Sequence, residues 1–403
     1  MDELFKPFLP YGRQTIESAD IAAVSAALES DRLTTGPEVE AFEAEIAAAV
    51  GAKFAVACSS GTAALHIAAA ALDLGPGDAV AVPTVTFVAT ANAARFCNAD
   101  VVFVDVNPET GLIDPESLAA AFDGPDGARI KAVFPVHLAG QSADLAAVRR
   151  IAEAHGARIV DDAAHAIGTR GVPGNPDCRI GDGAYADMTA FSFHPVKTVT
   201  TGEGGAVATN DAGLHRRLSR LRNHCQIRDA EEWEDRARAE EAESGSHPWY
   251  YEVAELGFNY RITDIQCALG RSQLQRLGTY VTRRAAIAER YAAAMSDFGP
   301  HVTVLKRVPD CRPAWHLAVV LVDFDHIGRS RADLMGALRA AGIGTQVHYI
   351  PVHLQPYYRR LYGERSLPGA EAYYAKALSL PLFPAMSDAD TDRVIRTLSA
   401  LLT

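Results

Sequence analysis

A single lysine stands between two apolar segments of the chain. Lys197 follows the run from Met188 to Phe193 and precedes a glycine-rich turn that leads into Ala206 to Thr209. These runs predict two buried strands joined by a loop. An amine held against apolar walls loses hydration, which lowers its pKa and makes it a nucleophile toward carbonyl carbons. Lys197 is therefore a candidate Schiff-base lysine, and an ordinary surface loop lysine is the alternative.

A second candidate site follows the short apolar run from Phe54 to Cys58. There the sequence Ser59-Ser60-Gly61-Thr62 precedes an alanine-rich helix expected over Ala63 to Leu72. The first turn of a helix presents unpaired backbone N–H groups and the positive end of the helix dipole, which together suit a phosphate. Serine and threonine also cap helices that bind nothing, so this motif alone leaves both interpretations open.

The elements that must position these residues alternate regularly between Ala79 and Asp162. Short β-branched runs (AVAVP, VVFVDV, KAVFPV and ARIVDD) alternate with helical segments near 87–96, 115–122 and 145–155. Such alternation predicts a parallel sheet covered by helices on both faces. Ligands of these sheets bind at the carboxyl ends of the strands, where Phe87, His137 and Asp162 are expected to lie.

The rest of the chain predicts a second, smaller domain. Long helices follow Ile265, and then come an expected strand from His316 to Val322, a helix from Ser330 to Ala341 and a strand from Gly344 to Tyr349. We therefore divide the chain into a large domain, 1–265, and a smaller α+β domain, 266–403.

Composition excludes several classes of protein. The formal net charge of −12 and the pI near 5.5 argue against nucleic acid or an anionic membrane as a partner. The N-terminal run MDELFKPFLP lacks the apolar stretch of a signal peptide, and no apolar run reaches membrane-spanning length, so we expect a cytoplasmic protein. The six cysteines lack CxxC spacing, which indicates neither a disulfide framework nor a zinc site.

The loop from His348 to Tyr358 is crowded with histidine and tyrosine. Its two histidines, His348 and His353, are five residues apart, a poor helical spacing for metal ligation, and prolines interrupt any helix between them. This spacing argues against a metal site, and no metal is expected.

The run SFHPVK from Ser192 to Lys197, followed by Thr-Gly-Glu-Gly-Gly at 201–205, resembles the pyridoxal-phosphate lysine motif of the DegT/DnrJ/EryC1/StrS sugar-nucleotide aminotransferases. The similarity extends from Pro10 to Pro384. It implies an α/β, fold-type I, PLP-dependent aminotransferase that uses pyridoxal 5'-phosphate. Within that family, the runs Trp249 to Arg261 and His348 to Tyr358 are most similar to the transaminases of pseudaminic acid biosynthesis.

The resemblance also implies roles for residues of the cofactor site. Asp162, in the run Asp161-Asp162-Ala163-Ala164-His165, would keep the pyridine nitrogen protonated, with Asp161 in place of the family's usual Glu. His165 would lie near the phenolic oxygen, and Phe87 would stack on the ring. Without the resemblance, the two acids would be a strand-end turn and Phe87 a core residue. The implied phosphate ligands are Ser60, Gly61, Thr62, Ser192 and, reaching across from the partner subunit, Asn259.

The substrate implied by the resemblance is a nucleotide-linked keto sugar, with L-glutamate as the amino donor. The subfamily points to a UDP-linked 4-keto-6-deoxy-N-acetyl hexose aminated at C4, and a 3-keto sugar is the alternative. Thr34 and Thr35 either border the substrate or cap the helix that begins at Pro37. Local cations such as Arg228 or Arg261 would offset the diphosphate, and the acidic stretch 230–248 is either a lid or a solvated segment. The remaining candidate substrate residues are His348 and Tyr349.

Three other functions were weighed. Family members that act as dehydratases have lost the lysine, so the presence of Lys197 argues against that class. A non-catalytic regulatory module that keeps the fold stays open, because fold alone does not fix function. A dinucleotide-dependent oxidoreductase would need GxGxxG after the first strand, where this chain has SSGTAA at 59–64. We expect a homodimer with shared active sites.

Overall fold

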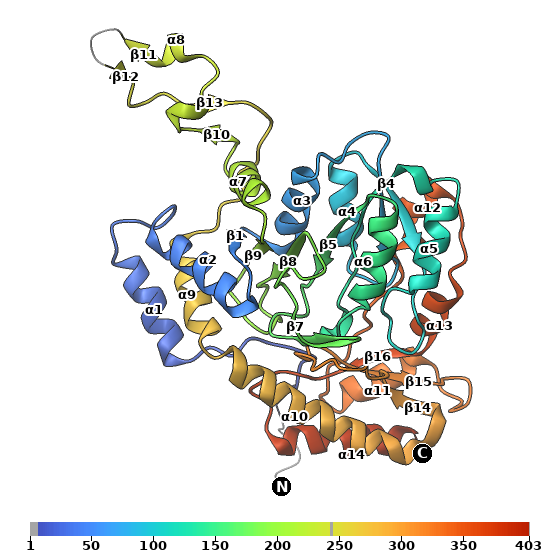
Figure 1. The fold of residues 1–403 in the computed structure, drawn as a ribbon. Helices are drawn as coiled ribbons and strands as arrows, with labels where there is room; N and C mark the ends of the chain where they lie inside the picture. The colour runs from blue at the N-terminus through green and yellow to red at the C-terminus, as the bar shows by residue number, and fades with distance from the viewer. Residues whose placement is uncertain (1–6, 242–244, 403) are drawn as a thin grey trace.

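A computed structural model describes residues 7–241 and 245–402, and its centre is a seven-stranded sheet (Figure 1). The strand order is β1-β9-β8-β5-β4-β2-β3, and β9 alone runs antiparallel to the others. The mainly parallel sheet expected from the sequence is confirmed. Its strands are β1 (Phe54–Cys58), β2 (Ala79–Pro83), β3 (Asp100–Val104), β4 (Ile130–Val133), β5 (Arg158–Asp162), β8 (Met188–Ser192) and β9 (Gly205–Thr209).

Helices cover both faces of this sheet, as predicted. Alternate residues of one strand enter different cores: Ala55 and Ala57 of β1 pack in one cluster, and Val56 and Cys58 in the other. The first cluster also contains residues of α2 (Pro37–Val50), α5 (Pro115–Asp123), α6 (Leu145–Ala154) and α9 (Asp264–Leu274). The second contains residues of α3 (Gly61–Ala71), α4 (Val88–Phe96) and α7 (Ala212–Leu221).

A smaller α+β body follows in the chain. Its sheet, in the order β14-β15-β16, is antiparallel throughout. A third hydrophobic cluster joins this sheet to helices α10, α11, α13 and α14. The elements are α10 (Leu277–Met295), β14 (Val302–Val304), β15 (Ala318–Val322), α11 (Arg331–Ala340), α12 (Pro356–Tyr362), α13 (Pro368–Lys376), β16 (Ala377–Leu380) and α14 (Asp388–Leu402).

The expected strand from Gly344 to Tyr349 is wrong. This segment divides its pairing between two partners, because Gly344 N donates to Leu9 O at 2.7 Å whereas Gln346 pairs with Ser379 of β16. Neither partner runs far enough beside the segment to form a continuous ladder. The third strand of the small sheet is β16 instead.

The two bodies share elements near the expected boundary. Cys267 and Leu274 of α9 pack in the core of the large body, and Leu9, near the start of the chain, packs in the core of the small one. The boundary at residue 265 stays a prediction.

An arm extends from the large body at the upper left of Figure 1. Its elements are β10 (Gln226–Ile227), α8 (Arg236–Ala239), β11 (Glu240–Glu241), β12 (Gly245–Ser246) and β13 (Glu252–Val253). The arm contains most of the acidic stretch 230–248, of which residues 242–244 lie outside the described residues. Whether that stretch is a lid stays a prediction.

Several short elements complete the chain. The sequence did not predict the hairpin of β6 (Arg170–Val172) and β7 (Asn175–Arg179). The others are helix α1 (Ser18–Leu28) and short 3-10 turns at Gly127–Arg129, Leu138–Gly140, Ala230–Glu232, Ser296–His301 and Val352–Leu354. Over the described residues, every helix is too short or too polar to cross a membrane. Residues 1–6 of the N-terminal run, on which the expected lack of a signal peptide partly rests, lie outside that range.

Candidate active site

Lys197 lies in the turn after β8, at the carboxyl edge of the large sheet. Its neighbour is the end of β5, because β5 and β8 pair in parallel and Asp162 stands opposite Ala190. Solvent reaches part of the Lys197 side chain, but the surrounding protein displaces enough water to lower the pKa of its amine to about 8. The carboxylate of Asp162 opposes this shift, and the buried guanidinium of Arg284 adds to it. The environment is the one expected for a nucleophilic amine.

Asp162 is buried at the end of β5 and held from two sides. Thr90 Oγ1, in the first turn of α4, donates a hydrogen bond of 2.6 Å to its Oδ2, and Ala164 N donates one of 3.1 Å to its Oδ1. Asp161 points to the opposite face of the sheet, as alternation along a strand requires. Its carboxylate lies 3.5 Å from His137 Nε2 in the interior. Of the two adjacent acids, only Asp162 therefore acts on Lys197.

His165 and Tyr349 meet above this edge, although 184 residues separate them. The Tyr349 hydroxyl lies 3.1 Å from His165 Nε2, and the His165 ring packs 4.4 Å from the ring of His316. Burial, together with the charge of Lys197, lowers the pKa of His165 well below its ordinary value. A neutral imidazole that shares a hydrogen bond with a phenol follows from this environment.

The two histidines of the 348–358 loop have structural partners. His348 Nδ1 lies 2.8 Å from the hydroxyl of Ser379, and burial lowers the pKa of His348 to about 3, with a contribution from the charge of Lys197. His353 Nδ1 lies 2.7 Å from Thr84 Oγ1. The described residues contain no group of three or more His, Cys, Asp or Glu side chains placed to hold a metal ion.

Phe87 is exposed, which contradicts the alternative that it packs in the core. Its relative exposure is 56%, and its ring centroid lies 6.1 Å from that of Tyr349. It precedes the first residue of α4, directly beyond β2. A bare aromatic face at this edge can stack on a flat heteroaromatic ring.

Two glycines allow the start of α3 to approach the strands closely. A Cβ on Gly61 would lie 2.7 Å from Ser192 Cβ, and one on Gly205 would lie 2.4 Å from Ser60 O. Ser60 caps the helix, because its hydroxyl accepts a hydrogen bond from Ala63 N at 3.1 Å. The N–H groups of the first helical turn, including that of Thr62, therefore lie beside Ser192, as a phosphate site requires.

Thr34 and Thr35 are exposed in the loop before α2, and the structure shows no contact between them and Lys197. The alternative that they cap α2 is wrong. Asp264 of α9 provides the cap instead, since its carboxylate accepts from Gly36 N at 2.9 Å and from Glu38 N at 3.1 Å. A side chain more than two hundred residues away could not be found from local spacing.

In the part of the chain that the structure describes, Arg228 and Asn259 make their contacts with residues other than Lys197. Arg228 is on the arm, with its guanidinium 5.4 Å from the ring centroid of Tyr251. Asn259 is exposed where the arm returns to the body, and only its backbone pairs, with Asn223. The roles expected for both residues stay predictions.

Three further residues at the site were missed by sequence reasoning. Thr90 comes three residues after Phe87 in the first helical turn, and that spacing could have indicated it. His316 and Arg284 come from the small body and carry no local motif. Arg284 is fully buried on α10, where it donates to Leu382 O at 2.9 Å.

Comparison with known proteins decides the family. The sequence profile of the DegT/DnrJ/EryC1/StrS aminotransferase family matches residues 14–399. The chain belongs to this family. This aminotransferase is 42% identical over 391 residues to the spore coat polysaccharide biosynthesis protein SpsC of Bacillus subtilis (strain 168), covering 96% of this chain and 95% of SpsC.

Solved structures agree with the assignment. Helicobacter pylori PseC, an aminotransferase involved in the biosynthesis of pseudoaminic acid, matches with a TM-score of 0.87 and 26% identity, over 98% of this chain and 99% of PseC. S. venezuelae DesV matches with a TM-score of 0.84 and 34% identity, over 98% and 99%. The protein is therefore a sugar aminotransferase and an enzyme, which sets aside the non-catalytic alternative.

This aminotransferase is pyridoxal-phosphate-dependent, like its family. The residues at the sheet edge fit that group on physical grounds. Lys197 is a nucleophilic amine, Phe87 offers a bare ring, and Asp162 is a buried carboxylate with a fixed orientation. The close approach of α3 to Ser192 brings a serine hydroxyl next to the start of a helix, a combination that suits a phosphate.

Proposed function

We propose that this enzyme transfers an amino group to C4 of a UDP-linked 4-keto-6-deoxy-N-acetyl hexose, with L-glutamate as the donor. The contact that carries the proposal is the hydrogen bond between Tyr349 and His165 beside the exposed ring of Phe87. It places a polar, partly aromatic wall next to the reactive lysine, which suits a sugar. The similarity to PseC, an aminotransferase involved in the biosynthesis of pseudoaminic acid, supports the same substrate class.

Lys197 holds the cofactor and carries the proton in this proposal. With the pKa of its amine lowered to about 8, a substantial fraction is neutral near physiological pH. A neutral amine can attack a carbonyl and, once released, can remove a proton from one carbon and deliver it to another within reach. The buried positive charge of Arg284 nearby opposes protonation of that amine.

Pyridoxal phosphate, when bound, supplies the electron sink that lets a C–H bond next to nitrogen ionise. Asp162 would hold the proton on the pyridine nitrogen, because a buried carboxylate stabilises a nearby cation. The hydrogen bond from Thr90 fixes the direction of that carboxylate. His165, neutral and bonded to Tyr349, would face the phenolic oxygen.

The phosphate would be bound at the start of α3. The proposed ligands are the backbone N–H groups of Ser60, Gly61 and Thr62, the hydroxyls of Ser60, Thr62 and Ser192, and Asn259 from a partner subunit. In a homodimer the exposed Asn259 would reach the phosphate site of the partner subunit. Thr34, Thr35, Arg228, His348 and Tyr349 are the residues proposed for the sugar nucleotide.

Replacing Tyr349 with Phe tests this assignment. We expect the half-reaction with the keto sugar to slow by about 10-fold or more, because the phenol can no longer donate a hydrogen bond, while the half-reaction with glutamate is nearly unchanged. Single-turnover absorbance changes measure the two halves separately. Tyr357→Phe is the matched control, because Tyr357 is exposed on α12.

Equal damage to both halves would show that Tyr349 supports the cofactor rather than the sugar. Preference for a 3-keto isomer over the 4-keto sugar would reject the proposed substrate and leave the family assignment intact.

A further inference from the structure

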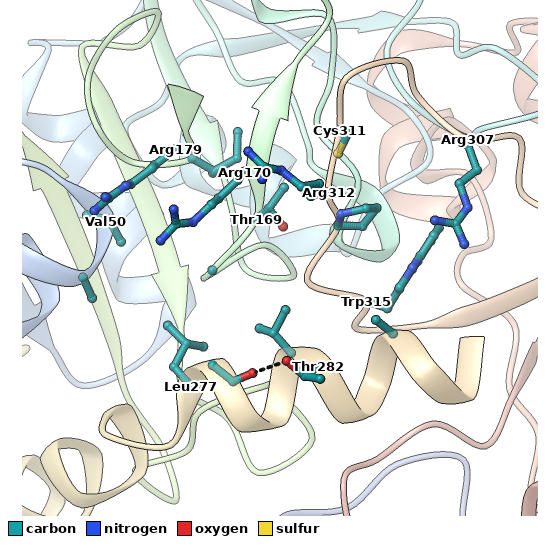
Figure 2. A pocket seen from close by; sticks show the side chains of 17 residues that line it. Val50, Thr169, Arg170, Arg179, Leu277, Thr282, Arg307, Cys311, Arg312 and Trp315 are labelled. Carbon is teal, nitrogen blue, oxygen red and sulfur yellow. Dashed lines mark hydrogen bonds between the residues drawn. The ribbon is translucent and has the colours of Figure 1, made fainter. Parts of the chain in front are cut away.

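A cavity of about 570 Å³ lies where the two bodies meet. Its walls are the β6–β7 hairpin of the large body, the start of α10, and the loop that precedes β15 (Figure 2). Lys197, Asp162, His165 and Phe87 are not among its lining residues. The volume is in the range of small-molecule sites, about 300–1,000 Å³.

Cations dominate the polar part of this cavity. Arg170, Arg179, Arg307 and Arg312 line it, and no aspartate or glutamate is among the described residues that do. Figure 2 shows Arg170, Arg179 and Arg312 on the side of the cavity opposite Leu277 of α10. In a chain of net charge −12, this is a local reversal of sign.

The backbone places two of these arginines directly opposite each other. Arg170 and Arg312 are directly opposite each other in an antiparallel bridge, with Arg312 N donating to Arg170 O at 2.7 Å and Arg170 N to Arg312 O at 3.2 Å. Like charges in directly opposite positions are destabilising. Gly171 permits the arrangement, because its φ is +80° and a Cβ there would lie 2.0 Å from Asp310 O.

The protein does not supply a counter-charge to most of this group. Arg307 pairs with Glu289, whereas Arg170, Arg179 and Arg312 have no carboxylate within salt-bridge distance in the described parts of the chain. The acidic residue nearest in sequence to Arg312 is Asp310, and its carboxylate accepts from Gly174 N at 3.0 Å instead. The Arg312 guanidinium donates to Pro176 O at 3.0 Å, a neutral acceptor that leaves its charge without a counter-charge. Guanidinium groups without a counter-charge in a cavity bind phosphate oxygens, often through two parallel hydrogen bonds.

The remaining wall is apolar. Leu277 and Val281 of α10, Ile180 and Trp315 supply it. A ligand that matches the whole cavity therefore has an anionic end and a flat or apolar end, which together describe a nucleotide. We propose that this cavity is a second, non-catalytic site that binds a nucleoside diphosphate. Because the ligand would contact both bodies, its binding is expected to raise the melting temperature of the enzyme.

Isothermal titration of the cofactor-loaded enzyme with UDP tests the proposal. We expect two classes of UDP site per chain in the wild type, the catalytic site and this one. Removing two guanidinium groups in the double variant Arg170→Ala/Arg179→Ala should weaken the second class by at least about 10-fold and leave the first unchanged. Arg360→Ala is the matched control, since it removes an exposed arginine on α12.

A second variant tests the cavity without touching its charges. A Cβ on Gly278 of α10 would meet no atom within 4 Å, so Gly278→Leu extends into open space beside the cavity. It should also remove the second class of site. The fold of each variant is checked by its melting curve and by transamination, which depends on residues elsewhere.

The choice of probe separates two sources of diphosphate. UDP binding at least about 10-fold tighter than inorganic pyrophosphate at the second class supports a nucleoside ligand that uses the apolar wall. Equal binding of the two would contradict the nucleoside part. If neither variant weakens any class of UDP site, the proposal is overturned. A single class of site that both variants weaken would support this cavity and would contradict the UDP-linked substrate of the proposed function instead, so failure of the two proposals can be told apart.

Discussion

The catalytic centre and the arm differ in how their polar and aromatic side chains are held. At the centre, hydrogen bonds orient Asp162 and His165, and the elements involved come from both bodies of one chain. On the arm, Trp249 is 70% exposed and Leu256, where the arm returns to the body, is 84% exposed. The contacts that orient Asp162 and His165 all lie within a single chain. The arm presents apolar surface of the kind that a second molecule covers, consistent with the proposed homodimer.

Replacing Lys197 with Ala should have the largest effect on the activity of the catalytic centre. We expect turnover to fall by about 10³-fold or more, because no other described group stands ready as the nucleophile and proton carrier. Steady-state transamination measures the loss. Lys131→Ala is the control, as Lys131 is exposed on β4. Comparable activity in the two variants would refute the role of Lys197.

A second test replaces Asp162 and uses its neighbour Asp161 as the control. Asp162→Asn should lower the rate by about 10² to 10⁴-fold, because an amide cannot hold the proton of the pyridine nitrogen. Asp161→Asn removes a carboxylate next to His137 on the other face, so it should reduce stability and largely spare activity per folded molecule. Rates normalised to folded enzyme separate the two, and a reversed order would reject the assignment.

The lowered pKa of Lys197 predicts a pH dependence. Only the neutral amine is nucleophilic, so reaction of the cofactor-free enzyme with pyridoxal phosphate should accelerate as pH rises through about 8. Between pH 7 and pH 9 we expect about a 10-fold increase, followed by a plateau. Stopped-flow absorbance measures the rate. A rate still climbing steeply above pH 10 would indicate an ordinary solvated lysine.

Dimers of two different variant subunits test the proposed homodimer, and their change in activity is the smallest that we predict. Lys197→Ala and Asn259→Ala are each expected to be inactive as pure enzymes. After random exchange about a quarter of wild-type activity should return, because half of the dimers are mixed and each holds one intact site. No recovery after exchange proven by mass spectrometry would place the action of Asn259 within its own chain.

Local patterns and distant contacts explain what the sequence could and could not predict. The alternation of apolar runs predicted the sheet from Ala79 to Asp162, which the structure shows. The contact of Tyr349 with His165 depends on how the small body docks, and no local spacing encodes it. The same holds for Asp264 at the start of α2.

Competition between partners explains the one wrong strand. The residues after Ile343 have a strand-like sequence, but their pairing is divided between Leu9 of the N-terminal segment and Ser379 of β16. Edge pairing of this kind depends on the tertiary fold rather than on propensity.

Borohydride reduction of the cofactor-loaded enzyme, followed by peptide mass mapping, tests the central claim most directly. Reduction fixes the cofactor to the lysine that holds it. The account predicts one pyridoxyl adduct, on Lys197, in the peptide that contains SFHPVK. An adduct on any other lysine, or none in an enzyme shown to contain the cofactor, would contradict it.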